Sequence, residues 1–131
     1  MSRKTVSSNS PFEEKIGFSR AKRIGNIIAV SGTAPLTESG ATAFHGDAYG
    51  QTKRCLEIIQ KAIEEAGGKL EDVIRTRLYL VDVHRWKECG RAHAEFFGEI
   101  KPASTFVEVS HLIRSDWLVE IEAECVLEEE E

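Results

Sequence analysis

The chain has 131 residues, a length typical of a single domain, and its composition is 41% hydrophobic and 30% charged, as in globular proteins. A net charge of −5 without any block of lysine and arginine argues against a dedicated nucleic-acid-binding protein. The first ten residues are polar, and no apolar run approaches the roughly 18 residues of a membrane helix, so we expect neither a signal peptide nor a membrane protein. Cys55, Cys89 and Cys125 lack CxxC spacing, which predicts reduced thiols and a cytoplasmic location.

The first half of the chain predicts two strands and then a long helix. Residues 1–10 form an N-terminal segment with room for one more strand at 4–8, and residues 18–31 contain two short strands joined at Gly25-Asn26. Residues 33–46 predict a loop. Asp47 is the expected N-cap of a helix that ends at Gly67-Gly68. Its apolar stripe comprises Cys55, Leu56, Ile59, Ala62, Ile63 and Ala66.

The second half predicts a strand, a helix and two further strands. Residues 73–81 alternate, so that one face is expected to carry Ile74, Thr76, Leu78 and Leu80, and the other Arg75, Arg77 and Tyr79. A helix follows Asp82 and ends at Gly98. Its stripe is Trp86, Cys89 or Gly90, His93, Phe96 and Phe97. Strands are expected at about 103–109 and at 118–126, where Glu120, Glu122 and Glu124 share one face.

This order of elements predicts an α+β fold in which two helices cover one face of a sheet. The face left uncovered is expected to carry Arg75, Arg77, Ser104, Phe106, Glu108, Glu120, Glu122 and Glu124. Opposite charges on neighbouring strands can compensate each other, and the aromatic residue among them suggests burial against other subunits. The run of glutamates at 128–131 is expected to form a solvated acidic tail.

Few residue patterns in the sequence point to specific chemistry. The GxSxG, GxGxxG, GxxxxGK[ST] and HExxH motifs are all missing. Cys89 and His93 have a spacing found in metal sites, but no third ligand follows, and a buried cysteine is more often a small hydrophobic residue. We therefore predict no metal site. The histidines at 45, 84 and 111 are isolated, and without a partner they are expected to be surface or loop residues.

Glu120 is the strongest catalytic candidate because it lies mid-strand between Val119 and Ile121. Enclosure of this carboxylate would raise its pKa toward the range that is useful for proton transfer, whereas a nearby arginine would lower it. The pattern alone favours a structural alternative, an ion pair between Glu120 and Arg75 or Arg77 on the neighbouring strand.

Four segments together resemble the RidA (YjgF) family of reactive-intermediate deaminases: GFSRAKRIGNIIAVSGTAP, RTRLYLVDV, RAHAEFFGEIKPASTFVEVSHL and VEIEAECV. The resemblance spans about residues 16–127 and implies a single chorismate-mutase-like domain over residues 1–131. It also implies a homotrimer whose sheets form an internal β-barrel, with small-molecule clefts between subunits. Archetypal members hydrolyse enamines and imines such as 2-aminoacrylate without a metal or cofactor.

The resemblance implies a set of cleft residues, several of which differ here. The family's substrate-binding arginine follows a Pro-Ala pair, but Ser104 follows Pro102-Ala103 in this chain. A cysteine two residues later is replaced by Phe106, a tyrosine by Phe18 and an asparagine by Gly90, whereas Ser31 and Glu120 remain. The implied roles are catalytic for Glu120 and substrate-binding for Phe18, Arg20, Ser31, Gly90, Ser104, Thr105 and Phe106.

Loss of the arginine predicts weak or absent activity on ordinary 2-imino acids, and the departure resembles the divergent, arginine-lacking branches of the family. Two charge-assisted hydrogen bonds to a carboxylate are worth on the order of a hundredfold to several thousandfold in binding. Arg20 is a possible substitute cation if it shares a face with Phe18, and the alternative is an exposed charge at the sheet edge.

Three functions follow from this resemblance, and we favour a cofactor-independent enamine or imine hydrolase with Glu120 directing water. A non-catalytic metabolite-binding or regulatory trimer is the alternative. A ribonuclease or translation inhibitor, the label carried by some relatives, is least favoured because the chain is acidic.

Overall fold

A computed structural model of the chain describes residues 3–8 and 10–128, so most of the expected acidic tail at 128–131 lies outside the described residues. The elements, in chain order, are β1 (Arg3–Val6), α1 (Pro11–Ile16), β2 (Ala21–Ile24), β3 (Ile27–Thr33), α2 (Ala48–Glu65), β4 (Val73–Leu80), α3 (Trp86–Phe97), β5 (Ala103–Glu108) and β6 (Val119–Val126). Single 3-10 turns at Leu70–Asp72 and Val83–Arg85 lead into β4 and α3.

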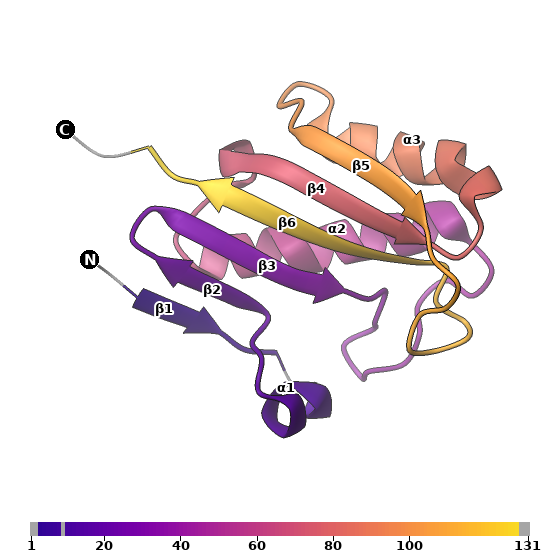
Figure 1. The fold of residues 1–131 in the computed structure, drawn as a ribbon, viewed down its shortest axis with the longest axis horizontal. Coiled ribbons are helices and arrows are strands. Elements are labelled where there is room, and N and C mark those ends of the chain that lie inside the picture. The colour runs from indigo at the N-terminus through magenta and orange to yellow at the C-terminus, as the bar shows by residue number, and fades with distance from the viewer. Residues whose placement is uncertain (1–2, 9, 129–131) are drawn as a thin grey trace.

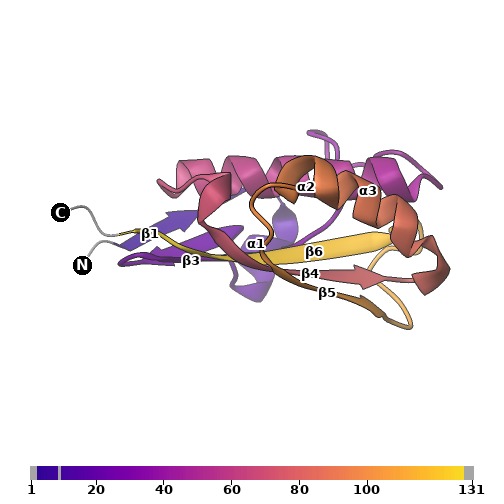
Figure 2. The same ribbon diagram turned by 90° about the horizontal axis from the view of Figure 1, so that it is seen from above.

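The six strands form one mixed sheet in the order β1-β2-β3-β6-β4-β5. Only the β4–β5 pair is parallel, and the other four pairs are antiparallel. Helices α2 and α3 lie side by side across one face of the sheet (Figures 1 and 2). The prediction of an α+β fold with two helices on one face of a sheet is therefore confirmed.

Helix α2 begins and ends as its sequence predicts. The Asp47 carboxylate accepts a hydrogen bond from the Gly50 N–H, and Gly67 follows the helix with a φ of +92°, a conformation that favours glycine. All six residues of the expected apolar stripe are buried in the core between helix and sheet. In the part of the chain that the structure describes, no helix is long and apolar enough to cross a membrane.

Helix α1 is an element that we did not predict. The Ser10 hydroxyl accepts from the Phe12 N–H, Pro11 occupies the first turn, and Gly17 ends the helix with a φ of +91°. These are ordinary helix start and stop residues, but the helix has only six residues and lacks a long apolar stripe. It lies near the ends of β1 and β2, away from α2 and α3 (Figure 1).

Two predicted strand faces are wrong in part. A bulge between Val73 and Arg75 makes Val73 the buried residue and leaves Ile74 50% exposed, because one inserted residue shifts the alternation. In β5, Ser104, Phe106 and Glu108 lie beside Thr76, Leu78 and Leu80 and therefore face the helices, not the open side of the sheet.

Candidate functional site

Glu120 lies on the face of β6 that the helices leave open, where it alternates with the buried residues Val119 and Ile121. Its side chain is half-buried and packs over Gly32 at the end of β3. A Cβ atom at position 32 would overlap the Glu120 Oε1. A glycine at this position is therefore needed for the carboxylate to occupy its place.

Arg20 lies close to the same carboxylate and is not the exposed edge charge that one interpretation of the sequence expected. Its Nη2 donates to the Gly32 carbonyl oxygen at 2.7 Å, and its guanidinium carbon lies 5.8 Å from the centre of the Phe18 ring. Arg20 Nε is buried and, among the described residues, has no hydrogen-bond partner. Burial lowers the pKa of Arg20, while Glu13 and Glu120 act in the opposite direction.

The pKa of Glu120 is raised from its ordinary value, mainly because burial disfavours the charged form. The Arg20 guanidinium lowers this pKa and the neighbouring Glu122 carboxylate raises it, but burial has the largest effect. A carboxylate whose pKa is raised is better suited to proton transfer near neutral pH than an exposed carboxylate is. Glu120, next to the partly buried cation of Arg20, can therefore accept a proton from a water molecule.

The expected ion pair of Glu120 with Arg75 or Arg77 is wrong. Arg77 Nη1 contacts the Oε1 atoms of Glu122 and Glu124 at 3.2 Å and 2.8 Å, and Tyr79 OH donates to Glu122 Oε1 at 2.6 Å. Glu120 lies opposite Tyr79 in the strand register. Arg77 therefore pairs with the other two glutamates of β6, and Arg20 is the cation that acts on Glu120.

A second polar group, formed by Ser104, Thr76 and His93, lies at the opposite side of the sheet. The parallel register places Ser104 of edge strand β5 beside Thr76 of β4, and the Thr76 hydroxyl donates to Ser104 Oγ at 2.8 Å. His93 Nε2 of α3 lies 2.8 Å from the same Thr76 Oγ1. The His93 ring packs against Phe97 and Phe106, with ring centres 4.7 Å and 5.9 Å apart, and burial lowers its pKa.

The connection of Thr76 and His93 to Ser104 was not predicted from the sequence. Each of the two residues is polar on a face that is otherwise apolar. Because a buried polar group needs a hydrogen-bond partner, the sequence indicates that each has one. Spacing along the chain did not reveal that the two meet, since they belong to a strand and to the helix that follows it.

The remaining candidate residues lie near Arg20, on the open face of the sheet, or on its helix side. The Ser31 hydroxyl donates to the Ser19 carbonyl at 2.6 Å, close to Phe18 and Arg20. Phe106 packs against the core, Thr105 lies beside Arg77 on the open face, and the space next to Gly90 in α3 holds no atom within 4 Å. One chain thus places Glu120, Phe18, Arg20 and Ser31 on one side and Ser104, Phe106 and Gly90 on the other.

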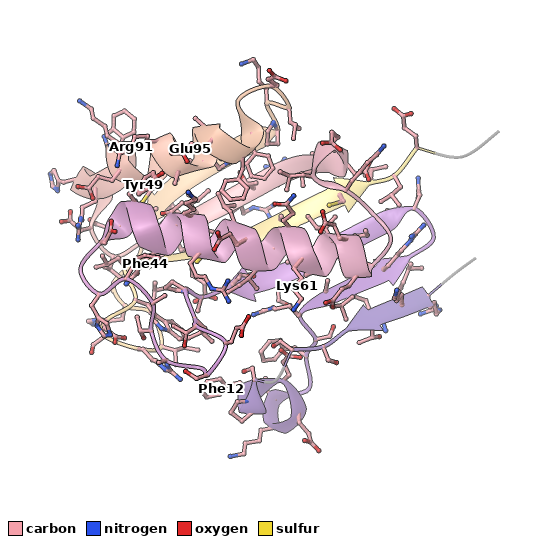
Figure 3. The ribbon with its side chains drawn as sticks, turned by 180° about the vertical axis from the view of Figure 1, so that it is seen from behind. Phe12, Phe44, Tyr49, Lys61, Arg91 and Glu95 are labelled. Atoms are coloured by element: carbon pink, nitrogen blue, oxygen red, sulfur yellow. The ribbon has the colours of Figure 1, made fainter. Side chains whose placement is uncertain are left out.

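A hollow of about 740 Å³ lies between the N-terminal segment, the loop after β3 and α2. Arg20 contributes to its wall, and Phe12 and Lys61 line it from α1 and α2 (Figure 3). Neither Glu120 nor Ser104 lines it, so we do not assign the chemistry to this hollow. Among residues 3–8 and 10–128, no three His, Cys, Asp or Glu side chains are grouped to hold a metal ion, and all three cysteines are free and buried.

Comparison with known proteins identifies the family. The family model described as Endoribonuclease L-PSP matches residues 9–127. This chain belongs to the RidA/YjgF family. A RutC family protein of Pyrococcus abyssi is 41% identical over 106 residues, which are 81% of this chain and 83% of that protein. The 3-aminoacrylate deaminase RutC of Acinetobacter baylyi is 38% identical over 101 residues, 77% and 79% of the two chains.

Solved structures of RidA/YjgF proteins share the fold of the whole chain. A YjgF-family protein of Mycobacterium tuberculosis is 44% identical, superposes with a TM-score of 0.88, and aligns with 96% of this chain and 100% of its own. The Escherichia coli YjgF protein is 29% identical with a TM-score of 0.81, over 94% and 98% of the two chains. The predicted RidA-type fold is thereby confirmed.

Proposed function

We propose that this RidA-family protein hydrolyses the C–N bond of a small enamine or imine and releases ammonia. The observation that carries the proposal is the half-buried Glu120 carboxylate, whose pKa is raised and which has no ion pair with the arginine of the neighbouring strand. The similarity to a protein named 3-aminoacrylate deaminase supports the same reaction class, because 3-aminoacrylate is an enamine.

In the proposed reaction, the enamine carbon gains a proton from solvent and the nitrogen loses one, which gives the imine. The ionised Glu120 then takes a proton from the water that attacks the imine carbon, while the imine nitrogen gains a proton from solvent, and a carbinolamine forms. Glu120 returns its proton to the nitrogen, the C–N bond breaks to release ammonia, and the hydroxyl group loses its proton to solvent to leave a carbonyl group, so that one water is consumed for each ammonia released. We assign Arg20 a supporting role: its guanidinium is held by the Gly32 carbonyl and the Phe18 ring and adjusts the pKa of Glu120. This assignment replaces a role for Arg20 as the substitute carboxylate clamp.

We further propose that the site is completed between two copies of the chain in a homotrimer. Within one chain Glu120 projects from the open face of the sheet, whereas Ser104 lies on the helix side of the edge strand. The two side chains can contact one small ligand only if they come from different copies. The mixture of Arg77 and glutamate charges on the open face fits a surface that faces other subunits in a barrel.

Ammonia release from a panel of enamines and imines tests this function. We expect Glu120→Gln to lower turnover by at least about a hundredfold, the usual contribution of a positioned acid or base. Glu124→Gln is the matched control, because it makes the same change on the same strand and face but next to Arg77. Equal activity of the wild type and Glu120→Gln, or no ammonia above background from any substrate, would contradict the proposal.

A further inference from the structure

The hydrogen-bonded chain His93–Thr76–Ser104 has a defined direction. Thr76 is fully buried and its hydroxyl has a single proton, which it donates to Ser104 Oγ at 2.8 Å. The 2.8 Å contact between Thr76 Oγ1 and His93 Nε2 must then have the imidazole as donor. A neutral imidazole has one N–H, so the proton of His93 lies on Nε2 and its Nδ1 is bare.

The proton of the Ser104 hydroxyl is left for a ligand. Ser104 is an exposed residue of the edge strand, and among the described residues its hydroxyl donates to no acceptor. Hydrogen bonds in a chain polarise one another, so the bond that Ser104 accepts from Thr76 strengthens the bond that it can donate. The buried end is fixed by the packing of His93 between Phe97 and Phe106.

The three hydrogen-bonded side chains of His93, Thr76 and Ser104 are all uncharged, and this limits the kind of ligand that they can bind. Burial keeps His93 neutral at physiological pH by lowering its pKa, and the ionised group further along the same face of β5 is the negative Glu108. A carboxylate moved out of water is stabilised best by a cation with two donors, whereas this group offers one neutral donor and no positive charge. A carbonyl oxygen of an ester or amide needs one neutral donor, which Ser104 supplies.

We propose that Ser104 donates to an uncharged carbonyl oxygen of the substrate, and that Thr76 and His93 are positioning residues that fix its direction. This inference rests on the proposed function and names its substrate class: enamines conjugated to an ester or amide group. Neither Thr76 nor His93 has a role in the reaction proposed above.

A matched pair of enamines tests the substrate class. Methyl 3-aminocrotonate carries a neutral methyl ester where 3-aminocrotonate carries a carboxylate, and hydrolysis gives methyl acetoacetate or acetoacetate plus ammonia. We expect the wild-type protein to have a kcat/KM for the ester that is about tenfold or more above that for the acid. A preference for the acid would overturn the inference.

The hydroxyl of Thr76 can be removed with little change in volume. Thr76→Val should lower kcat/KM for the ester by about 3- to 10-fold, and Thr76→Ser should restore it, because serine supplies the same donor. Thr52→Val is the control, since Thr52 is equally buried but donates to the Ala48 carbonyl within α2. Equal losses in Thr76→Val and Thr52→Val would reduce Thr76 to a structural residue and overturn its positioning role.

Two measurements separate this inference from the proposed function because neither depends on turnover. The ring nitrogen shifts of His93 in the full chain should show the Nε2–H tautomer at neutral pH, and the Nδ1–H tautomer would overturn the donor direction. Methyl acetoacetate should bind more tightly than acetoacetate and lose about 3- to 10-fold in Ser104→Ala. Absence of this preference would overturn the inference even if ammonia is released, and its presence without ammonia release would contradict the proposed function alone.

Discussion

The Glu120 group and the Ser104 group differ in what holds their working side chain in place. Glu120 is charged, and the backbone positions it: Gly32 leaves room for the carboxylate, and the Gly32 carbonyl holds Arg20 nearby. Ser104 is neutral, and side chains from β4 and α3 position it. Within one chain, the charged Glu120 and the uncharged Ser104 therefore lie on different faces of the sheet, and our proposal that they form one site requires a second copy to combine them.

Among the variants that test how Glu120 and Ser104 are held in place, the largest effect is expected for Gly32→Ala, which tests whether the backbone makes room for Glu120. A Cβ at this position would overlap the Glu120 Oε1 and force the carboxylate to move. Displacement of a catalytic group by about 1 Å costs on the order of a hundredfold, so we expect kcat/KM for ammonia release to fall by about that factor. Unchanged kcat/KM in a folded Gly32→Ala protein would contradict this role of Gly32.

The pH dependence of activity tests whether Arg20 adjusts Glu120. Burial raises the pKa of Glu120, so the acid limb of kcat/KM should lie above the ordinary glutamate value of about 4.3. Arg20 favours the ionised carboxylate and lowers this pKa, and Arg20→Gln should therefore move the limb to higher pH. Arg23→Gln is the control, because Arg23 bonds to the carbonyls of Gly25 and Ala66 instead. A limb that moves to lower pH in Arg20→Gln, or equally in both variants, would refute the assignment.

The smallest effect, a change in the free energy of unfolding, is expected for Gly90→Ala in α3, on the helix side of the sheet. Gly90 lies inside α3 and a Cβ there meets no atom within 4 Å, so the change should stabilise the fold by about 0.5–1 kcal/mol through helix propensity. Urea unfolding measures the gain. Gly98→Ala is the contrast, because its Cβ would lie 2.7 Å from the Ala94 carbonyl oxygen. A loss of stability in Gly90→Ala would contradict the open space beside this residue.

Elements with long, regular patterns could be predicted from the sequence. The alternation in β6 identified the open face of Glu120, and the stripe and N-cap of α2 identified a core helix. The phase of a strand is harder to predict, because alternation alone does not say which set of residues faces the helices. Ser104 and Phe106 were assigned to the wrong face for this reason, and the bulge before Arg75 reversed the position of Ile74.

The candidate site could be predicted only in part. Glu120 stood out because it is an acid within a mostly apolar strand, but its partner could not be identified, since Arg20 approaches from the start of β2 while Arg77 lies on the adjacent strand. The chain of Thr76, His93 and Ser104 joins residues 17 and 28 positions apart, and no local spacing encodes it. It depends on the parallel β4–β5 register and on how α3 packs across it.

The placement of α3 also depends on contacts that have no sequence pattern. The Tyr49 hydroxyl of α2 donates to Glu95 Oε2 of α3 at 2.6 Å, and the Arg91 guanidinium carbon lies 4.2 Å from the centre of the Tyr49 ring (Figure 3). These contacts join the two helices along their exposed side.

Subunit mixing tests most directly whether Glu120 and Ser104 act together from two copies of the chain. Glu120→Gln and Ser104→Ala proteins would be unfolded, combined in equal amounts and refolded, with separately refolded samples as the reference. In randomly mixed trimers about a quarter of the clefts would contain both native residues and another quarter would lack only Ser104, so ammonia release should rise to roughly 0.3 of the wild-type rate, at least about twice the mean of the separate variants. Activity that stays at the mean of the two separate variants would contradict a site shared between chains.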